Sequence, residues 1–391
     1  MSNKIFCTAP FTTLRIESYN NSSTDHKDLG VVFKPGCVYD PMTPISSLDE
    51  YLDGSEMSAH RDNLCNGTVP RLNCHRCSTP EKLGLQSIRL DLLKKPWASD
   101  QKKIYLLDIF YGNTCNLGCL MCGPEWSSYA AEERYKAGLL KERVKSKNNI
   151  PVALRTMKKL PDLKSVSFIG GEFFIVKENV LILDQIIEMN LGCSISTNAS
   201  LLDDKMIAKL EQIKDLEVQI SVDGTEDVYE LIRFPASWEV FTKNVQELKK
   251  RLSWAKIHFN IVIQPLNIQN LHEVYECNNK FLCHTHHQII DTPFHLSWPI
   301  LLPEERNRVS TLLKEKQQQK YAITKQQKQT IDDLIQALDR VEHSPELRAK
   351  AVTWLSTLLK YRKVSNHKIK KVTGVFDTLG NELIDRMNQT A

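Results

Sequence analysis

Short apolar stretches alternate with amphipathic stretches from residue 106 to about residue 300. The apolar stretches have the length and composition of buried strands, whereas the stretches between them, such as 180–187 and 240–248, repeat their apolar residues with a helical period. Repeated strand–helix units pair their strands in parallel. The predicted strands span residues 106–111, 165–169, 192–197, 217–222, 257–263 and 294–298. We therefore expect an α/β fold with a TIM-like partial (β/α)6 barrel.

The segments on either side of this core follow other patterns. Residues 8–18 and 31–33 are expected to pair as a hairpin, and the serines and acids of 46–50 have the spacing of a helix start, for a helix that runs to about residue 64. Apolar stripes predict C-terminal helices over 331–341 and 352–359, and the Gln/Lys-rich residues 314–328 are expected to form an exposed helix or linker. The predicted domains are residues 1–100, a small auxiliary domain; 101–302, the barrel; and 303–391, a helical extension.

Composition narrows the class of protein. No run of about 18 apolar residues occurs, so no membrane-spanning helix is predicted and the expected location is the cytoplasm. The net charge is +4, but the part from residue 311 onward holds 15 Lys and Arg against 9 Asp and Glu. These charges recur at helical spacing without interleaved aromatic residues, which favours a solvated face over a nucleic-acid site.

Three of the eleven cysteines, Cys115, Cys119 and Cys122, form a C-x3-C-x2-C run directly after the first predicted barrel strand. Clustered cysteines in a chain without a secretory signal favour metal ligation over disulfides. A cubane iron–sulfur cluster has four iron corners, so three thiolates leave one iron open. Zinc is the alternative metal, but a closed zinc site takes four ligands and no His or Cys nearby in the sequence supplies the fourth.

This run resembles the cluster-binding loop of the radical S-adenosylmethionine (SAM) superfamily. The resemblance implies a [4Fe-4S] cluster whose open iron binds SAM, reductive cleavage of SAM, and a 5′-deoxyadenosyl radical that abstracts hydrogen from a substrate. The residues of 115–124 resemble in particular the branch whose members carry a twitch or SPASM-like auxiliary domain. Met121 occupies a position that is often aromatic in the superfamily, and the resemblance assigns its backbone carbonyl to the adenine amine.

Three further segments match the superfamily in the expected order. Gly170, Gly171 and Glu172 resemble the motif that binds the SAM amino group, with Phe173 where the family has proline. A plain strand-to-helix turn would explain the same residues. The resemblance also assigns SAM contacts to Ser196, Thr197, Asn198, Ser221, Asp223, Arg233 and Ile263. The ordinary alternatives are turn formation for the polar residues, a helix-surface charge for Arg233 and core packing for Ile263.

Four cysteines precede the barrel: Cys7, Cys37, Cys74 and Cys77. Their arrangement around the expected hairpin and helix resembles the auxiliary-cluster domain, here placed before the barrel, and implies a second [4Fe-4S] cluster. Cys65 is a fifth candidate ligand. Zinc is an alternative, because four thiolates also suit a tetrahedral ion.

The remaining cysteines and the histidines near them are expected to be structural. Cys193 is predicted to be a buried strand thiol. The others lie between predicted strands, on an expected helix and the loop after it; they are Cys277, Cys283, His284, His286 and His287.

The leading hypothesis is thus a radical SAM enzyme with one auxiliary cluster. The resemblance implies an electron donor such as a flavodoxin or ferredoxin and allows a peptide or protein as substrate. The alternatives are an iron–sulfur electron-transfer protein and a zinc-stapled binding protein, neither of which would use SAM.

Overall fold

The computed structural model describes residues 7–18, 31–37, 44–67, 74, 77, 81, 87–100, 103–145, 148–290, 293–319 and 323–389. The chain divides into two compact units. Unit 1 comprises residues 1–113, 146–196 and 203–217, and unit 2 comprises residues 114–145, 197–202 and 218–391.

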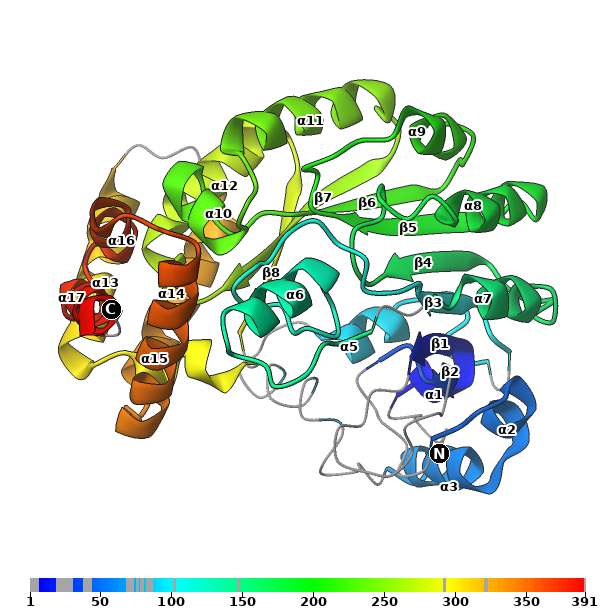
Figure 1. Cartoon of the computed structure of the whole chain (residues 1–391). Helices are drawn as coiled ribbons and strands as arrows, with labels where there is room; N and C mark the ends of the chain where they lie inside the picture. The colour runs from blue at the N-terminus through cyan, green and yellow to red at the C-terminus, as the bar shows by residue number, and fades with distance from the viewer. Residues whose placement is uncertain are drawn as a thin grey trace. The chain divides into compact units, whose positions relative to one another are not determined.

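The strands of unit 1 form a mostly parallel sheet. β3 (Leu106–Phe110), β4 (Ser165–Ile169) and β5 (Gly192–Thr197) pair in parallel, β1 (Thr13–Ser18) pairs in parallel with β3, and β2 (Val31–Lys34) pairs antiparallel with β1. Their register aligns Ile16, Ile109, Phe168 and Ile195 in one row of fully buried side chains. This row forms the apolar face of the sheet. The helices that follow β3, β4 and β5 in this unit are α7 (Ile150–Met157), α8 (Asn179–Glu188) and α9 (Asp204–Leu210) (Figure 1).

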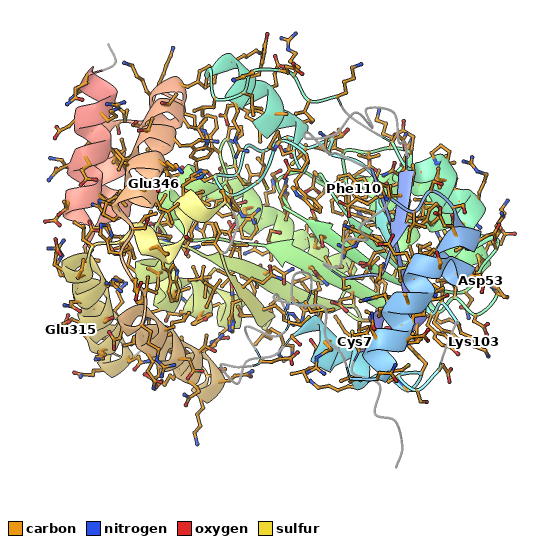
Figure 2. The ribbon with its side chains drawn as sticks, turned by 90° about the horizontal axis from the view of Figure 1, so that it is seen from below. Cys7, Asp53, Lys103, Phe110, Glu315 and Glu346 are labelled. Carbon is orange, nitrogen blue, oxygen red and sulfur yellow. The ribbon has the colours of Figure 1, made fainter. Side chains whose placement is uncertain are left out.

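The N-terminal part of unit 1 is built from short helices: α1 (Ala9–Thr12), α2 (Leu48–Asp53), α3 (Ser55–Cys65) and α5 (Ile88–Leu93). Ser47 caps α2 by accepting a hydrogen bond from the amide of Glu50, as the capping pattern predicted. The single helix expected here is divided at Gly54, where the backbone is extended. The buried guanidinium of Arg61 ties the segment together by donating to the carbonyls of Pro10, Tyr51 and Leu52. Figure 2 labels Cys7 before α1 and Phe110 at the end of β3.

Unit 2 contains the end of β6 (Leu216–Ser221), then β7 (Lys256–Ile263) and β8 (His284–Ile289), which pair in parallel. The aromatic ring of Phe241 lies 6.3 Å from that of Phe259, so α11 packs on β7. The helices beside these strands are α6 (Ser128–Lys136), α10 (Glu226–Ile232), α11 (Trp238–Arg251) and α12 (Leu271–Lys280).

The sixth barrel strand differs from the prediction. Residues 294–298 belong to two short 3-10 helices, η2 (Phe294–Leu296) and η3 (Trp298–Ile300), and β8 is the strand beside β7. Pro299 falls in the first turn of η3, and proline has no amide hydrogen for a strand ladder. His284, His286 and His287 therefore lie in a strand and not in a loop, whereas Cys277 does lie on a helix. Cys193 is buried in β5, as predicted.

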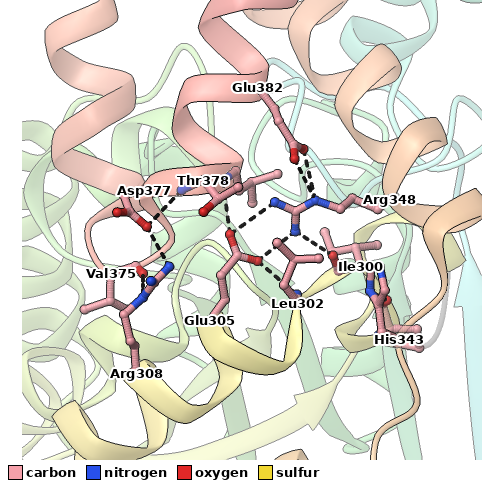
Figure 3. A network of polar contacts seen from close by, with 12 residues as sticks. Ile300, Leu302, Glu305, Arg308, His343, Arg348, Val375, Asp377, Thr378 and Glu382 are labelled. Carbon is pink, nitrogen blue, oxygen red and sulfur yellow. Dashed lines mark hydrogen bonds and ion pairs between the residues drawn. The ribbon is translucent and has the colours of Figure 1, made fainter.

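Among the described residues after η3, the helices are α13 (Pro303–Gln318), α14 (Lys325–Asp339), α15 (Pro345–Tyr361), α16 (Asn366–Thr373) and α17 (Asp377–Gln389) (Figure 1). Their buried polar centre is the ion pair between Arg348 Nη1 and Glu305 Oε2, 2.7 Å apart. Glu305 also accepts from the amide of Leu379, and Arg348 donates to Glu382 (Figure 3). These contacts join α13, α15 and α17.

The strand order is β2-β1-β3-β4-β5-β6-β7-β8, a sheet of eight that does not close. The predicted fold class, an α/β partial barrel with C-terminal helices, is therefore confirmed, and β1 and β2 extend the sheet beyond the six strands expected. No helix in the described part of the chain is long and apolar enough to span a membrane.

Candidate functional site

The cysteine run forms a loop of unit 2 with a fixed backbone. The amide of Gly118 donates to Phe234 O at 2.7 Å, and the amide of Leu120 donates to Ile232 O at 2.9 Å. Ser128 Oγ also accepts from the amide of Cys115 at 3.1 Å. The loop is thus paired with the last residue of α10 and the segment after it, and its three cysteines are held from both ends.

Two polar side chains that the sequence singled out lie beside the thiols. Asn198 Nδ2 is 3.9 Å from Cys115 Sγ and donates to Asn116 Oδ1 at 3.1 Å. Arg233 Nη1 is 3.9 Å from Cys119 Sγ. N–H groups at these positions can hydrogen-bond to sulfur, an interaction that tunes iron–sulfur clusters.

Arg233 is a buried charge and not the helix-surface charge of the alternative reading. It is 6% exposed and its Nη2 lies 2.7 Å from Asp223 Oδ2. Asp223 Oδ1 in turn accepts from the amide of Val262. Burial raises the pKa of Asp223, although Arg233 opposes this shift. Within the described residues, the buried Nε–H of Arg233 has no hydrogen-bond partner. An anionic ligand would satisfy it.

The thiols differ in their tendency to ionise. A hydrogen bond with Cys122 lowers the pKa of Cys119 to about 7 against the effect of burial, and the cationic Arg233 and Arg362 lower it further. The same hydrogen bond and burial raise the pKa of Cys122. These shifts favour the thiolate form at Cys119 over Cys122. Because thiolates are the form that binds metal, this environment suits a metal ligand.

One residue directly after β7 carries a signal that only its burial in the fold reveals. Gln264 is fully buried, and neither its Oε1 nor its Nε2 has a hydrogen-bond partner among the residues that the structure describes. The amide of Gln264 donates to Asn267 Oδ1, and Asn267 Nδ2 donates to Asp223 O. Leaving a buried amide unsatisfied costs about 1–3 kcal/mol, so Gln264 marks a place where a polar ligand group can bind.

The other predicted residues of unit 2 have less distinctive surroundings. Thr197 is buried and its Oγ1 accepts from the amide of Ala199, which is a turn contact. Ser221 is half-buried at the carboxyl end of β6, and Met121 is half-buried in the cysteine loop. Ile263 is fully buried on the same side of β7 as Phe259, which is the packing alternative for this residue.

In unit 1, Gly170 and Gly171 follow β4. Gly170 has a φ of +133°, and a Cβ there would lie 2.4 Å from Gly112 O, which also accepts from the amide of Gly171. Only glycine fits this close approach. Glu172 is fully buried and accepts from the amide of Phe174. Phe173, where the family has proline, is also fully buried, with its ring 5.0 Å from that of Phe168. Ser196 is half-buried in β5.

The N-terminal thiols influence one another. Burial raises the pKa of Cys7 to about 12, and the Cys37, Cys77 and Cys74 thiolates add to the rise. Burial and Cys77 likewise raise the pKa of Cys74. All four sulfurs of the predicted auxiliary site therefore lie within electrostatic range, whereas Cys65 does not contribute to these shifts. The donor set fits a thiolate-bound metal or cluster, whose positive charge would relieve the repulsion.

Across the described residues, no three His, Cys, Asp or Glu side chains converge on one metal ion. A cubane makes a different demand, because each of its cysteines binds a different iron corner.

Two cations at the cysteine loop were missed at the sequence level. Arg134 Nη2 donates to the carbonyls of Cys119 and Leu120, both at 3.3 Å. Arg362 donates to the carbonyl of Gly118 across 244 positions in the chain. Arg134 could have been suspected from its place in the helix after the loop, but no local pattern connects residue 362 with residue 118.

One family model matches part of this chain. The Radical SAM superfamily matches residues 109–277, which include the cysteine loop, Gly170 and Arg233. A comparison with curated protein sequences finds no match.

Solved structures show likenesses at low identity. Native anSMEcpe with bound AdoMet is 19% identical over 54% of this chain and 59% of its own, with a TM-score of 0.39. Streptococcus suis SuiB bound to S-adenosylmethionine is 12% identical over 76% of this chain and 69% of its own, with a TM-score of 0.41. SuiB bound to precursor peptide SuiA is 13% identical over 71% and 54%, with a TM-score of 0.39. The chain thus spans little more than half the length of two of these proteins.

Proposed function

Taking residues 109–277 as a radical SAM domain, we propose that this protein is an enzyme that binds a [4Fe-4S] cluster through Cys115, Cys119 and Cys122 and cleaves SAM. One observation carries the proposal. Within unit 2, a side chain from the loop after β5 and one from the segment after α10 both approach the sulfurs of the cysteine loop, Asn198 at Cys115 and Arg233 at Cys119. A loop that served only as a turn would not require these polar neighbours.

The bound cluster would supply the hard chemistry: reductive cleavage of SAM at the open iron and a 5′-deoxyadenosyl radical for hydrogen abstraction. The residues around the loop would hold the cluster in position and limit its contact with water. Cys119 is 5% exposed, which limits access of water to its sulfur. Asp223 holds the Arg233 guanidinium in place, and Arg134 fixes the carbonyls of the loop.

The SAM contacts are part of the proposal. The unsatisfied Nε–H of Arg233 is a donor for the SAM carboxylate, and the unsatisfied amide of Gln264 can pair with the adenosyl group. The resemblance assigns the SAM amino group to Gly170, Gly171 and Glu172. The further contacts proposed from the resemblance are Met121, Ser196, Thr197, Asn198, Ser221, Asp223 and Ile263.

We also propose that Cys7, Cys37, Cys74 and Cys77 bind an auxiliary [4Fe-4S] cluster. The mutual effect of these thiols on their pKa values supports a common ligand, and the resemblance of this region favours iron–sulfur over zinc. The proposed electron donor is a flavodoxin or ferredoxin. The proposed substrate class is a peptide or protein, since residues 115–124 resemble the loop of relatives that modify peptides.

Reconstitution with iron and sulfide without oxygen tests the function. The reduced protein should give a paramagnetic resonance signal that changes when SAM is added, and 5′-deoxyadenosine should accumulate. Replacing Cys277, which lies on α12 outside both cysteine groups, should leave both results unchanged. A reduced cluster signal that SAM does not alter, with no 5′-deoxyadenosine, would show that the function is wrong.

A further inference from the structure

The C-terminal extension contacts the cysteine loop through one buried arginine. Arg362 ends α15, and its side chain is fully buried. Its Nη2 donates to the carbonyl of Gly118, between Cys115 and Cys119. Its Nη1 donates to Leu231 O at 3.3 Å. One guanidinium therefore binds the cysteine loop and the end of α10 together.

A buried carboxylate completes this contact. Arg362 Nε lies 2.9 Å from Glu133 Oε1 and Nη2 lies 2.7 Å from Glu133 Oε2, so the pair is bidentate. Glu133 comes from α6, the helix that follows the loop, and its side chain is 3% exposed. The guanidinium also lies 4.7 Å from the ring centroid of Phe234. Only the planar fork of arginine can make all of these contacts at once.

The identity of Gly118 follows from this packing. A Cβ at residue 118 would lie 2.6 Å from Glu133 Oε2 and 3.1 Å from Arg362 Nη2. The ion pair thus occupies the space that a side chain would need. The loop, Glu133 and Arg362 form one fitted unit although they come from distant parts of the chain.

A second layer of contacts holds the extension against the same helix. Lys368 and Lys371 of α16 pair with Asp227 of α10, and Lys368 also pairs with Glu230 at 3.0 Å. Part of the C-terminal basic charge is therefore neutralised by acids of the barrel segment. The residues that follow α10 are those that bind the loop amides and supply Arg233.

We propose that Arg362 is a positioning residue for the cluster at Cys115, Cys119 and Cys122, so that the C-terminal extension is part of the catalytic machinery. This inference rests on the proposed function for the identity of the cluster. Arg362 holds the loop in the shape that places its sulfurs. Together with Glu133, it also sets the charge around the cluster, and this charge affects the reduction potential.

The two members of the pair give opposite electrostatic predictions. Arg362→Gln removes a cation and leaves Glu133, so reduction becomes harder and the midpoint potential becomes more negative. Glu133→Gln removes the anion and leaves Arg362, so the midpoint becomes more positive. Both variants break the same contact. If the variants only disturbed the fold, both midpoint potentials would shift in the same direction. Shifts of opposite sign therefore indicate an effect of charge and not a loss of fold.

Hydrogen exchange provides a readout that needs no bound cluster. In Arg362→Gln, the amides of residues 114–124 should exchange about tenfold faster or more, because the bond to Gly118 O and a buried charge partner are lost. Arg362→Lys should restore the charge but only part of the protection. A double variant with Leu in place of both Arg362 and Glu133 leaves no unpaired buried charge, so the protein should still fold. The loop should nevertheless loosen, because the contact with Gly118 is lost.

Arg348 is the matched control. It lies in the same helix α15, is nearly as buried, and pairs with the fully buried Glu305, but it contacts Ile300 and Glu382 and not the cysteine loop (Figure 3). Arg348→Gln should loosen the C-terminal helices while the exchange of residues 114–124 stays at the wild-type rate.

The outcomes decide the inference as follows. It holds if loop exchange rises in Arg362→Gln but not in Arg348→Gln and the two midpoint shifts have opposite signs; any other pattern overturns it. If the wild-type protein binds no SAM-responsive cluster, the proposed function fails, and the exchange comparison alone then decides whether Arg362 positions the loop.

Discussion

The two cysteine groups are assembled in different ways. Cys115, Cys119 and Cys122 lie within one short loop whose backbone is bonded to residues 232–234. The four N-terminal cysteines come from separate segments of unit 1, and only the fold brings their thiols within electrostatic range of one another. A local motif can be recognised from spacing alone, whereas a dispersed set depends on the fold that gathers it.

Their electrostatic surroundings differ as well. Arginines lie beside the loop, and the pKa of Cys119 is lowered to about 7. Among the N-terminal thiols, burial and mutual repulsion raise the pKa of Cys7 to about 12. In the loop, a hydrogen bond from Cys122 and two arginines favour the thiolate of Cys119, whereas burial and neighbouring thiols disfavour that of Cys7.

The largest effect should come from Cys119→Ala. It removes one of the three proposed thiolate ligands of the loop, so the open-iron cluster should be lost and 5′-deoxyadenosine formation should fall at least about a thousandfold, to background. Chromatography of the products measures this. If the variant still forms 5′-deoxyadenosine at the wild-type rate, the loop cysteines do not bind the cluster that cleaves SAM. The proposed difference in function between the loop cysteines and the N-terminal cysteines would then be wrong.

Cys37→Ala should have a large but selective effect. Removing one N-terminal ligand should lower the iron content from about eight to about four atoms per chain, while the SAM-dependent change in the resonance signal remains. Metal analysis beside spectroscopy checks both. Zinc in the wild-type protein, with four irons, would instead identify the N-terminal group as a zinc site.

The architecture could be largely predicted from the hydrophobic pattern. Five of the six expected barrel strands are present because their buried residues alternate or cluster clearly, as Val166 and Phe168 do in β4. β8 was missed because its half-exposed sequence, His284–Ile289, has little apolar character. Its pairing with β7 is a tertiary effect that no local propensity encodes.

The site could be predicted only where its residues carry a local signature. The cysteine run and the glycines after β4 were recognisable from spacing. Arg362 and Glu133 were not, because burial and ion pairing are properties of the fold. The C-terminal charges illustrate the limit. They were expected to be solvated, yet Arg348 and Arg362 are buried and Lys368 is paired.

Gly118→Ala should have a moderate effect that is confined to the loop cysteines and does not reach the N-terminal cysteines. The added Cβ would collide with Glu133 and Arg362, at a cost of about 1–3 kcal/mol typical of overpacking. The SAM-dependent signal should weaken and thermal stability should fall, while the N-terminal thiols keep their iron. An unchanged SAM response together with unchanged stability would contradict the tight packing of the loop.

The smallest effect concerns acid sensitivity. His60 lies on α3 in the N-terminal part of unit 1, where burial, with the neighbouring Arg61, lowers its pKa from 6.5 to about 4. The folded protein therefore holds His60 neutral, and the stability from this residue is fully present above pH 6.5 and is lost as the pH falls toward 4. Between pH 7 and pH 5.5 the loss should be about 1 kcal/mol.

Denaturant unfolding of wild type and His60→Gln at the two pH values measures this loss, and the variant should show a smaller difference. Exchange at the two pH values, corrected for its intrinsic pH dependence, should place the added opening in residues 44–67. His60→Gln should leave the exchange of residues 114–124 unchanged at both values, because the Arg362–Glu133 contact does not involve His60. If His60→Gln changed exchange equally in residues 44–67 and 114–124, His60 would not be the source of a local acid sensitivity.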